Sequence, residues 1–296
     1  MECVENILKL IVFYFKNKYL HWLLHTKYYN NTSKNSQIRV LHQSSNFIVL
    51  NKGHDILINS NDPTAKVSLE QQLNKAFPTL ANPNLRHSFY FPHRLDYATS
   101  GVICIALHKK ACSAATSAFE GRITKKYYLA LLRGHVSEEI VDISIAIGED
   151  SREIHSSHKM CTAKETACLL PRNAHTRLLI LERGLYCQYP ATKVLLRPIT
   201  GRRHQLRVHC SYIGHTIVGD FTYSRRKDNI PYRTFLHAFR LVLPTSIEFL
   251  DIQTPDPFTK DKLYNQWTPV EIINKLTNET LLKLNWEKEI LSSLKL

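Results

Sequence analysis

The residues best suited to chemistry lie in one loop, residues 92–101 (PHRLDYATSG). A carboxylate on a loop between rigid elements is often functional, and Asp96 is such a residue. Arg94 lies close before it, and a nearby cation favours the ionised carboxylate that a nucleophile needs. The simpler alternative is that Asp96 only caps the turn formed by residues 99–101 through its own backbone, and the loop alone favours that alternative.

A second segment, residues 200–209 (TGRRHQLRVH), places three arginines and two histidines at a predicted helix start. Guanidinium groups and helix N-termini both favour phosphate. On one helix, Arg202 and Arg207 would point in different directions, and whichever is buried needs an acidic partner. The spacing of His204 and His209 does not match helical metal ligands, so no metal site is expected. The alternative is a solvated basic face.

A third segment, residues 125–132 (KKYYLALL), alternates like a strand. Alternation sends Tyr128, Ala130 and Leu132 to one face and the intervening residues to the other. A tyrosine ring on a sheet can stack on a nucleobase. The alternative for Tyr128 is core packing with its hydroxyl hydrogen-bonded.

The charge of the chain indicates a partner for these segments. There are 39 Lys and Arg against 25 Asp and Glu, a formal net charge of +14. Such a surplus favours nucleic acid through counterion release, although excess lysine can also serve solubility. The 7 cysteines include no C-x-x-C pair, which argues against a disulfide framework or zinc ribbon and favours a reducing, intracellular compartment. The apolar stretch 7–24 is interrupted by Lys and His and is not expected to span a membrane.

The elements that must position the three segments are mixed helices and strands. The patterns predict a hairpin from residues 39–41 and 47–50, and strands at 102–107, 126–132, 192–196 and 236–242. They predict helices at 68–77, 109–120 and 202–213, and a helical tail from residue 267. An α+β fold is therefore expected.

Together these segments resemble the signature motifs of the RluA family of RNA pseudouridine synthases. The resemblance extends from Phe47 to about Phe258 and includes residues 50–52, 93–96, 99–101, Lys126 with 128–130, Gly219-Asp220 with Tyr223, and 236–238. Residues 134–135, 193–196 and 254–258 are most similar to a eukaryotic group within that family. After Lys52 this chain has Gly53, where much of the family has proline.

The resemblance implies that Asp96 is the catalytic residue, that Tyr128 stacks on the target uracil and that Arg207 pairs with Asp96. Arg94 would fill the space vacated by a flipped nucleotide. Further RNA contacts are expected from Lys126, Arg202, His204 and Gln205. Family members break the N1–C1′ bond of uridine, turn the uracil and join C5 to C1′, without metal or cofactor.

The implied architecture is a pseudouridine synthase fold, a mixed, largely antiparallel sheet flanked by helices with a central active-site cleft. We expect an N-terminal extension over 1–37, a catalytic domain over 38–258 and a C-terminal helical tail over 259–296. The expected protein is a monomer that binds RNA and no membrane. Two alternatives are a catalytically silent RNA-binding relative and an unrelated basic interaction protein, and the joint presence of Asp96, Tyr128 and Arg207 favours the enzyme.

Overall fold

The computed structural model of the protein describes residues 38–61, 68–154 and 157–285. The predicted N-terminal extension and the end of the predicted tail lie outside these ranges. The strands are β1 (Val40–Gln43), β2 (Phe47–Lys52), β3 (Ser100–Ala106), β4 (Lys125–Arg133), β5 (Ile140–Ile143), β6 (Ile147–Asp150), β7 (Met160–Thr162), β8 (Cys168–Arg172), β9 (Thr176–Tyr186), β10 (Tyr189–Pro198), β11 (Leu236–Pro244), β12 (Phe249–Gln253) and β13 (Trp267–Ile272). The helices are α2 (Leu69–Ala76), α3 (Lys109–Glu120), α4 (Gln205–Tyr212) and α5 (Asn278–Lys283), with 3-10 turns η1 (Pro78–Leu80) and η2 (Leu263–Asn265).

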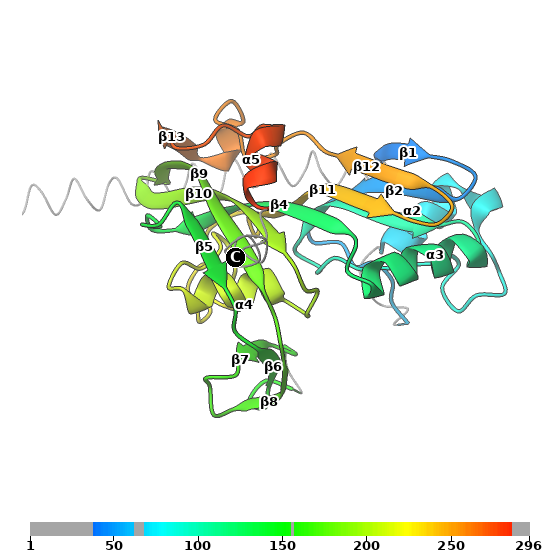
Figure 1. Cartoon of the computed structure of the whole chain (residues 1–296), viewed down its shortest axis with the longest axis horizontal. Helices are drawn as coiled ribbons and strands as arrows, with labels where there is room; N and C mark the ends of the chain where they lie inside the picture. The colour runs from blue at the N-terminus through cyan, green and yellow to red at the C-terminus, as the bar shows by residue number, and fades with distance from the viewer. Residues whose placement is uncertain (1–37, 62–67, 155–156, 286–296) are drawn as a thin grey trace, which may run out of the picture.

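Ten strands form the main sheet, whose central path runs β1-β2-β3-β11-β4-β10-β9-β13, with β12 paired to β11 and β5 to β9. The pair β3–β11 is parallel, and the other pairs are antiparallel. A separate sheet of three strands, β7-β6-β8, projects from the body below α4 (Figure 1). The predicted α+β class with a mixed, largely antiparallel sheet is confirmed. No helix within the described ranges is long and apolar enough to cross a membrane.

Local sequence accounts for the elements of the N-terminal half. The β1–β2 hairpin forms as predicted, and Ser44 closes its turn by accepting the amide of Phe47 at 3.1 Å. Helix α2 begins at a capping box in which Ser68 and Gln71 satisfy each other's amides. Pro78 follows its C-terminus, as predicted.

Helix α3 runs against the sheet on a face of small side chains. Ala111, Ala115 and Ala118 are buried in one apolar cluster with residues of β3 and β11. Their spacing of three and four residues keeps them on one side of the helix, and their size allows a close approach to the strands. The C-terminal end of α3 and the residues after it are thereby carried toward the loop that holds Asp96.

The parallel pair β3–β11 depends on Gly101. Predicted as part of a turn, Ser100 and Gly101 instead begin β3, where Gly101 lies opposite Ala238 of β11. Gly101 has a φ of +116°, and a Cβ there would lie 2.1 Å from the carbonyl oxygen of Ala238. Only glycine permits this approach of the two backbones.

The prediction of a helical tail from residue 267 is wrong. Residues Trp267–Ile272 form β13, an edge strand that pairs with β9, and its Pro269 is tolerated because an edge strand needs partners on one side only. The tail's helix is short, α5, and places Leu281 and Leu284 in the main core. The apolar spacing read as one long helix therefore belongs to a strand followed by a single short helix.

Gly101→Ala should lower the free energy of unfolding by at least about 3 kcal/mol, because it adds a backbone clash to a strained φ. Gly214→Ala is the matched control: its φ is +87°, but a Cβ there meets nothing within 4 Å. That control should lose only about 1–2 kcal/mol. Urea unfolding of both variants measures the difference, and equal losses would contradict the role given to the β3–β11 contact.

Candidate active site

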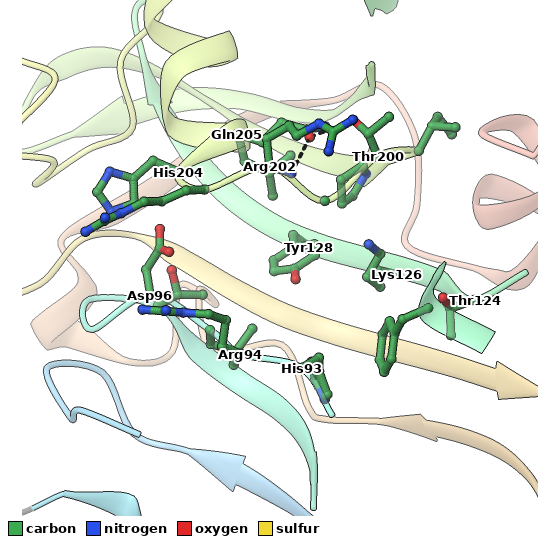
Figure 2. A pocket seen from close by; sticks show the side chains of 18 of the residues that line it. His93, Arg94, Asp96, Thr124, Lys126, Tyr128, Thr200, Arg202, His204 and Gln205 are labelled. Atoms are coloured by element: carbon green, nitrogen blue, oxygen red, sulfur yellow. Dashed lines mark hydrogen bonds between the residues drawn. The ribbon is translucent and has the colours of Figure 1, made fainter. Parts of the chain in front are cut away.

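A cavity of about 510 Å³ opens between the loop before β3, strand β4 and the segment that leads into α4 (Figure 2). All of the residues predicted to act in catalysis or RNA binding line it. They are Arg94, Asp96, Lys126, Tyr128, Arg202, His204, Gln205 and Arg207. Three segments far apart in the sequence therefore meet at one site.

The loop that carries Asp96 is held by backbone carbonyls. The amide of Thr99 donates to the carbonyl of Asp96 at 3.1 Å and closes the turn. The buried ammonium of Lys52 donates to the carbonyl of Tyr97 at 3.1 Å and to those of Gly53 and Ile56 at 2.9 and 2.8 Å. Burial lowers the pKa of Lys52 to about 7, an effect that the charges of Asp55 and Asp96 oppose. Because the backbone closes the turn, the Asp96 carboxylate is left to face the cavity.

The two tyrosines of strand β4 lie on opposite faces of the sheet, as the alternation predicts. Tyr127 is 2% exposed, and its hydroxyl donates to the side chain of Asn285 at 2.6 Å. Tyr128 lines the cavity, and in the described part of the chain its hydroxyl has no hydrogen-bond partner. Burial, reinforced by the charge of Asp96, raises the pKa of Tyr128, so the phenol is neutral near pH 7. Tyr127 fills the core position, and Tyr128 offers its ring to the cavity.

Lys126 lies on the same face of β4, two residues before Tyr128. Burial lowers the pKa of Lys126 to about 8. A Cβ added at Gly201 would lie 3.4 Å from its ammonium nitrogen, so this cation sits against the loop that precedes α4. Within the described ranges, no carboxylate lies within ion-pair distance of Lys126.

Arg207 of α4 is held between two carboxylates. Its Nε and Nη2 donate to both oxygens of Asp220, at 2.7 and 2.8 Å, and its Nη1 lies 3.6 Å from Oδ2 of Asp96. Burial opposes the charge of Arg207, but the hydrogen bonds and charge of Asp220, together with Asp96, raise its pKa. The Asp96–Arg207 pairing is therefore an ion pair longer than a hydrogen bond, and Asp220 fixes the guanidinium.

His204 is the N-cap residue that precedes α4, and it has the left-handed conformation, with a φ of +53°. Its Nδ1 lies 3.0 Å from the hydroxyl of Tyr223, which also accepts the amide of Met160 at 3.0 Å. The arrangement that satisfies both contacts has the hydroxyl donate to Nδ1, which leaves the ring proton on Nε2. Burial lowers the pKa of His204 to about 4, although the charge of Asp96 acts to raise it. The ring is therefore neutral near pH 7.

The helix predicted over 202–213 is shorter, because α4 begins at Gln205. The buried Gln205 side chain accepts from the amide of Arg202 and the hydroxyl of Thr200, and donates to His175 and Thr176. These contacts hold the preceding loop in a non-helical form, so the prediction that Arg202 shares a helix with Arg207 is wrong. They also use every donor and acceptor of the Gln205 amide within the protein, and its contact with RNA stays a prediction.

A second cavity, of about 970 Å³, adjoins the first. Arg94, Asp96, His204 and Arg207 line both cavities. We therefore describe one cleft with a first arm (the cavity beside Tyr128) and a second arm (the cavity beside Phe221 and Tyr232), which meet at Asp96.

The cleft offers a carboxylate, an aromatic ring and fixed cations. In the residues that the structure describes, no group of three or more His, Cys, Asp or Glu side chains could hold a metal ion. A ring such as that of Tyr128 can hold a planar base, and a carboxylate such as Asp96 can act as nucleophile or base.

A family model described as RNA pseudouridylate synthase matches residues 46–212, more than half of the chain. The chain belongs to the RNA pseudouridylate synthase family. It is 46% identical over 246 residues to RNA pseudouridylate synthase domain-containing protein 1 of Danio rerio, covering 83% of each. It is 33% identical over 208 residues to dual-specificity RNA pseudouridine synthase RluA of Yersinia pestis, covering 69% of this chain and 91% of that protein.

A solved structure, of human RNA pseudouridylate synthase domain containing 1, superposes with a TM-score of 0.75 at 40% identity, covering 85% of this chain and 96% of that one. The resemblance to the RluA family, and to a eukaryotic group within it, is confirmed.

No individual role was predicted from the sequence for three residues around this cleft. Asp220 holds Arg207, Tyr223 orients His204, and Lys52 holds the Asp96 loop. All three lie in segments that carried the family resemblance. A buried arginine needs an acidic partner, so a residue such as Asp220 was expected beside Arg207. The sequence alone does not indicate which of the acidic residues it is.

Asp220→Asn should lower the free energy of unfolding by about 3–5 kcal/mol, because it leaves the buried Arg207 without its main counterion. The matched change Asp96→Asn removes a carboxylate that is 23% exposed and more distant from Arg207. It should cost less than about 1 kcal/mol. Chemical denaturation compares the two, and a larger loss for Asp96→Asn would mean that Asp96 is the structural partner.

RNA binding should weaken as the pH rises through the pKa of Lys126, near 8, because the cation is present below that pH and lost above it. The loss should approach tenfold, the effect of one charge-assisted hydrogen bond of about 1.5 kcal/mol. Lys126→Met should bind more weakly at pH 7 and vary less between pH 7 and 9. Fluorescence anisotropy with labelled RNA makes the measurement, and parallel pH curves for both proteins would exclude Lys126 as the titrating group.

Proposed function

We propose that this member of the RNA pseudouridylate synthase family isomerises uridine to pseudouridine in RNA, with Asp96 as its catalytic residue. The observation that carries the proposal is the position of the Asp96 carboxylate, which faces a cavity lined by Tyr128 and lies 3.6 Å from the fixed guanidinium of Arg207. A target base must leave its stack to reach such a cavity, and the ring of Tyr128 gives it an aromatic surface on which to lie.

The reaction needs no external reagent, because substrate and product are isomers. The N1–C1′ bond of uridine breaks, the uracil turns, and a C5–C1′ bond forms; C5 loses a proton and N1 gains one. Asp96 starts this sequence either by attack on C1′ or by removal of the 2′ proton. On both routes Arg207 places a positive charge 3.6 Å from the Asp96 carboxylate, and no cofactor or metal takes part.

The surrounding cations are assigned to the RNA backbone and to the space left by the flipped nucleotide. Arg94 is exposed and lines both arms of the cleft, which suits the second task. Lys126 and Arg202, together with the neutral ring of His204, line the first arm and face the substrate. A net charge of +14 supports RNA over a neutral or basic partner.

The test is pseudouridine mapping of cellular RNA from cells that lack their own copy and express the wild type, Asp96→Asn or Asp261→Asn. Asp261 is exposed and lines neither arm, so its variant is the matched control. Sites present with the wild type and Asp261→Asn should vanish with Asp96→Asn, with a loss of at least about a thousandfold in rate, as for removal of a covalent catalyst.

Two results would count against the proposal. Identical maps with RNA binding intact would support the alternative of a catalytically silent RNA-binding relative. Identical maps without salt-dependent RNA binding would argue against a nucleic-acid function altogether.

A further inference from the structure

Three arginines from separate elements gather at the rim of the first arm. Arg122 follows α3, Arg172 ends β8 of the small sheet, and Arg202 lies before α4. Arg122 and Arg202 line the cavity, and Nε of Arg202 donates to the carbonyl of Asn173, next to Arg172, at 3.0 Å. We call these three residues the arginine rim.

The arginine rim lacks acidic partners. In the described part of the chain, no carboxylate lies within 4.0 Å of these three guanidinium groups, whereas several other arginines have such a partner. Those pairs include Arg133–Asp228, Arg152–Asp150, Arg177–Asp142, Arg207–Asp220 and Arg240–Asp251. Slight burial, and then the neighbouring charges of Arg172 and Arg122, lower the pKa of Arg202. Like charges are thus held together without an ion pair to any carboxylate among the residues described.

Arg202 is held in a fixed position for a ligand. Its amide donates to the buried Gln205, and its Nε to Asn173, at 2.9 and 3.0 Å. Its two terminal nitrogens, Nη1 and Nη2, find no acceptor among the residues described. A planar guanidinium whose two terminal nitrogens have no acceptor is suited to bidentate contact with a phosphate.

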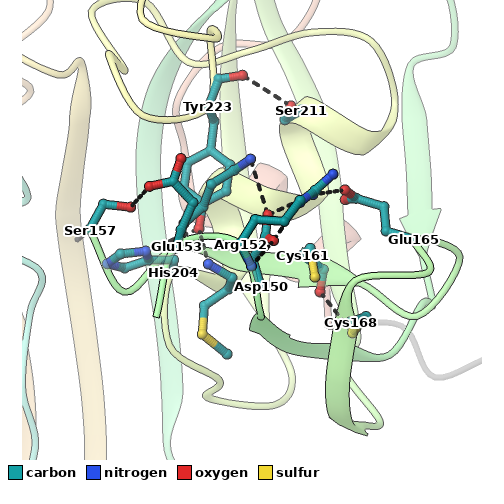
Figure 3. A network of polar contacts seen from close by, with 12 residues as sticks. Asp150, Arg152, Glu153, Ser157, Cys161, Glu165, Cys168, His204, Ser211 and Tyr223 are labelled. Carbon is teal, nitrogen blue, oxygen red and sulfur yellow. Dashed lines mark hydrogen bonds and ion pairs between the residues drawn. The ribbon is translucent and has the colours of Figure 1, made fainter. Parts of the chain in front are cut away.

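The small sheet that supplies Arg172 is fixed to the active-site wall (Figure 3). The Met160 amide on β7 donates to the hydroxyl of Tyr223, which contacts His204. Inside the sheet, the buried Asp150 binds Arg152 at 2.7 Å and Lys159 at 3.4 Å. Neutralised pairs therefore stabilise the sheet, while Arg172 at its end remains open to solvent.

Lys126 extends the same positive region into the cavity. Its ammonium lies against Gly201, the residue before Arg202. Cations thus run from Lys126, inside the first arm, outward to the arginine rim.

We propose that Arg122, Arg172 and Arg202 bind the sugar–phosphate backbone of the substrate RNA outside the nucleotide that enters at Asp96, which makes the small sheet part of the RNA interface. The inference rests on the proposed function for its ligand. The position of the arginine rim is independent of the chemistry at Asp96, because none of the three arginines contacts that carboxylate.

The test is RNA affinity as a function of salt for Arg122→Gln, Arg172→Gln, Arg202→Gln, the triple variant and a control. The control is Arg39→Gln, an exposed arginine beside β1 that lines neither arm. The probe is a fluorescently labelled stem–loop RNA with an all-uridine loop, and thermal unfolding checks that each variant is folded.

Each single substitution should weaken binding about three- to tenfold near 0.1 M salt. The slope of log affinity against log salt should fall by about 0.7 for each phosphate contact removed, and Arg39→Gln should leave it unchanged. A folded triple variant with the affinity and slope of the control would overturn the proposal. So would an affinity of the wild type that does not depend on salt.

Product formation separates this inference from the proposed function. In the triple variant, KM should rise while kcat at saturating RNA stays at the wild-type value. If wild type makes no pseudouridine but the rim variants lose affinity, the RNA site stands and the catalytic proposal fails. If pseudouridine forms and the triple variant binds like Arg39→Gln, the catalytic proposal stands and the rim is a solvated basic surface.

Discussion

Arg207 is a buried cation shared unequally by two carboxylates, and the geometry of the cleft depends on that inequality. Asp220, which is fully buried, takes two short hydrogen bonds, whereas Asp96 keeps only the third nitrogen, at 3.6 Å. A cation taken out of water needs a close, well-aligned partner, and Asp220 supplies it. Asp96 therefore experiences the positive charge of Arg207 without being bound in a tight pair. Its carboxylate stays available to a substrate.

Tyr223 connects this charge arrangement to the rest of the site. Its ring lies 5.0 Å from the guanidinium carbon of Arg207, and its amide donates to Asp220 at 3.2 Å. Its hydroxyl contacts both His204 and the small sheet. One side chain thus links the buried ion pair, the start of α4 and a separate sheet. A change at any of these places is expected to alter the others, because the contacts share the same residue.

Local patterns in the sequence predicted much of the site, and contacts between distant segments account for what they missed. The alternation of β4 predicted that Tyr127 and Tyr128 lie on opposite faces, because side-chain direction along a strand depends only on position; the structure has Tyr127 in the core and Tyr128 in the cleft. The pairing of Arg207 with Asp220 and the edge pairing of β13 with β9 depend on how separate segments meet, which periodicity does not encode. The hydrogen bonds from Gln205 to His175 and Thr176 likewise join segments that are distant in the sequence.

The basic side chains of this cleft fall into two groups, those that are buried and those that lie near solvent. Arg207, which is buried, is neutralised within the fold, and His204 is held neutral by burial. Arg94 and the arginine rim carry their charge near solvent, where a desolvation cost is small and a phosphate can reach them. If Arg94 or Arg203 closed on Asp96 as tightly as Asp220 closes on Arg207, the carboxylate would be bound in a salt bridge. Keeping the strong pair on Asp220 and the open cations at the rim allows one cleft to attract a polyanion and still present a reactive carboxylate.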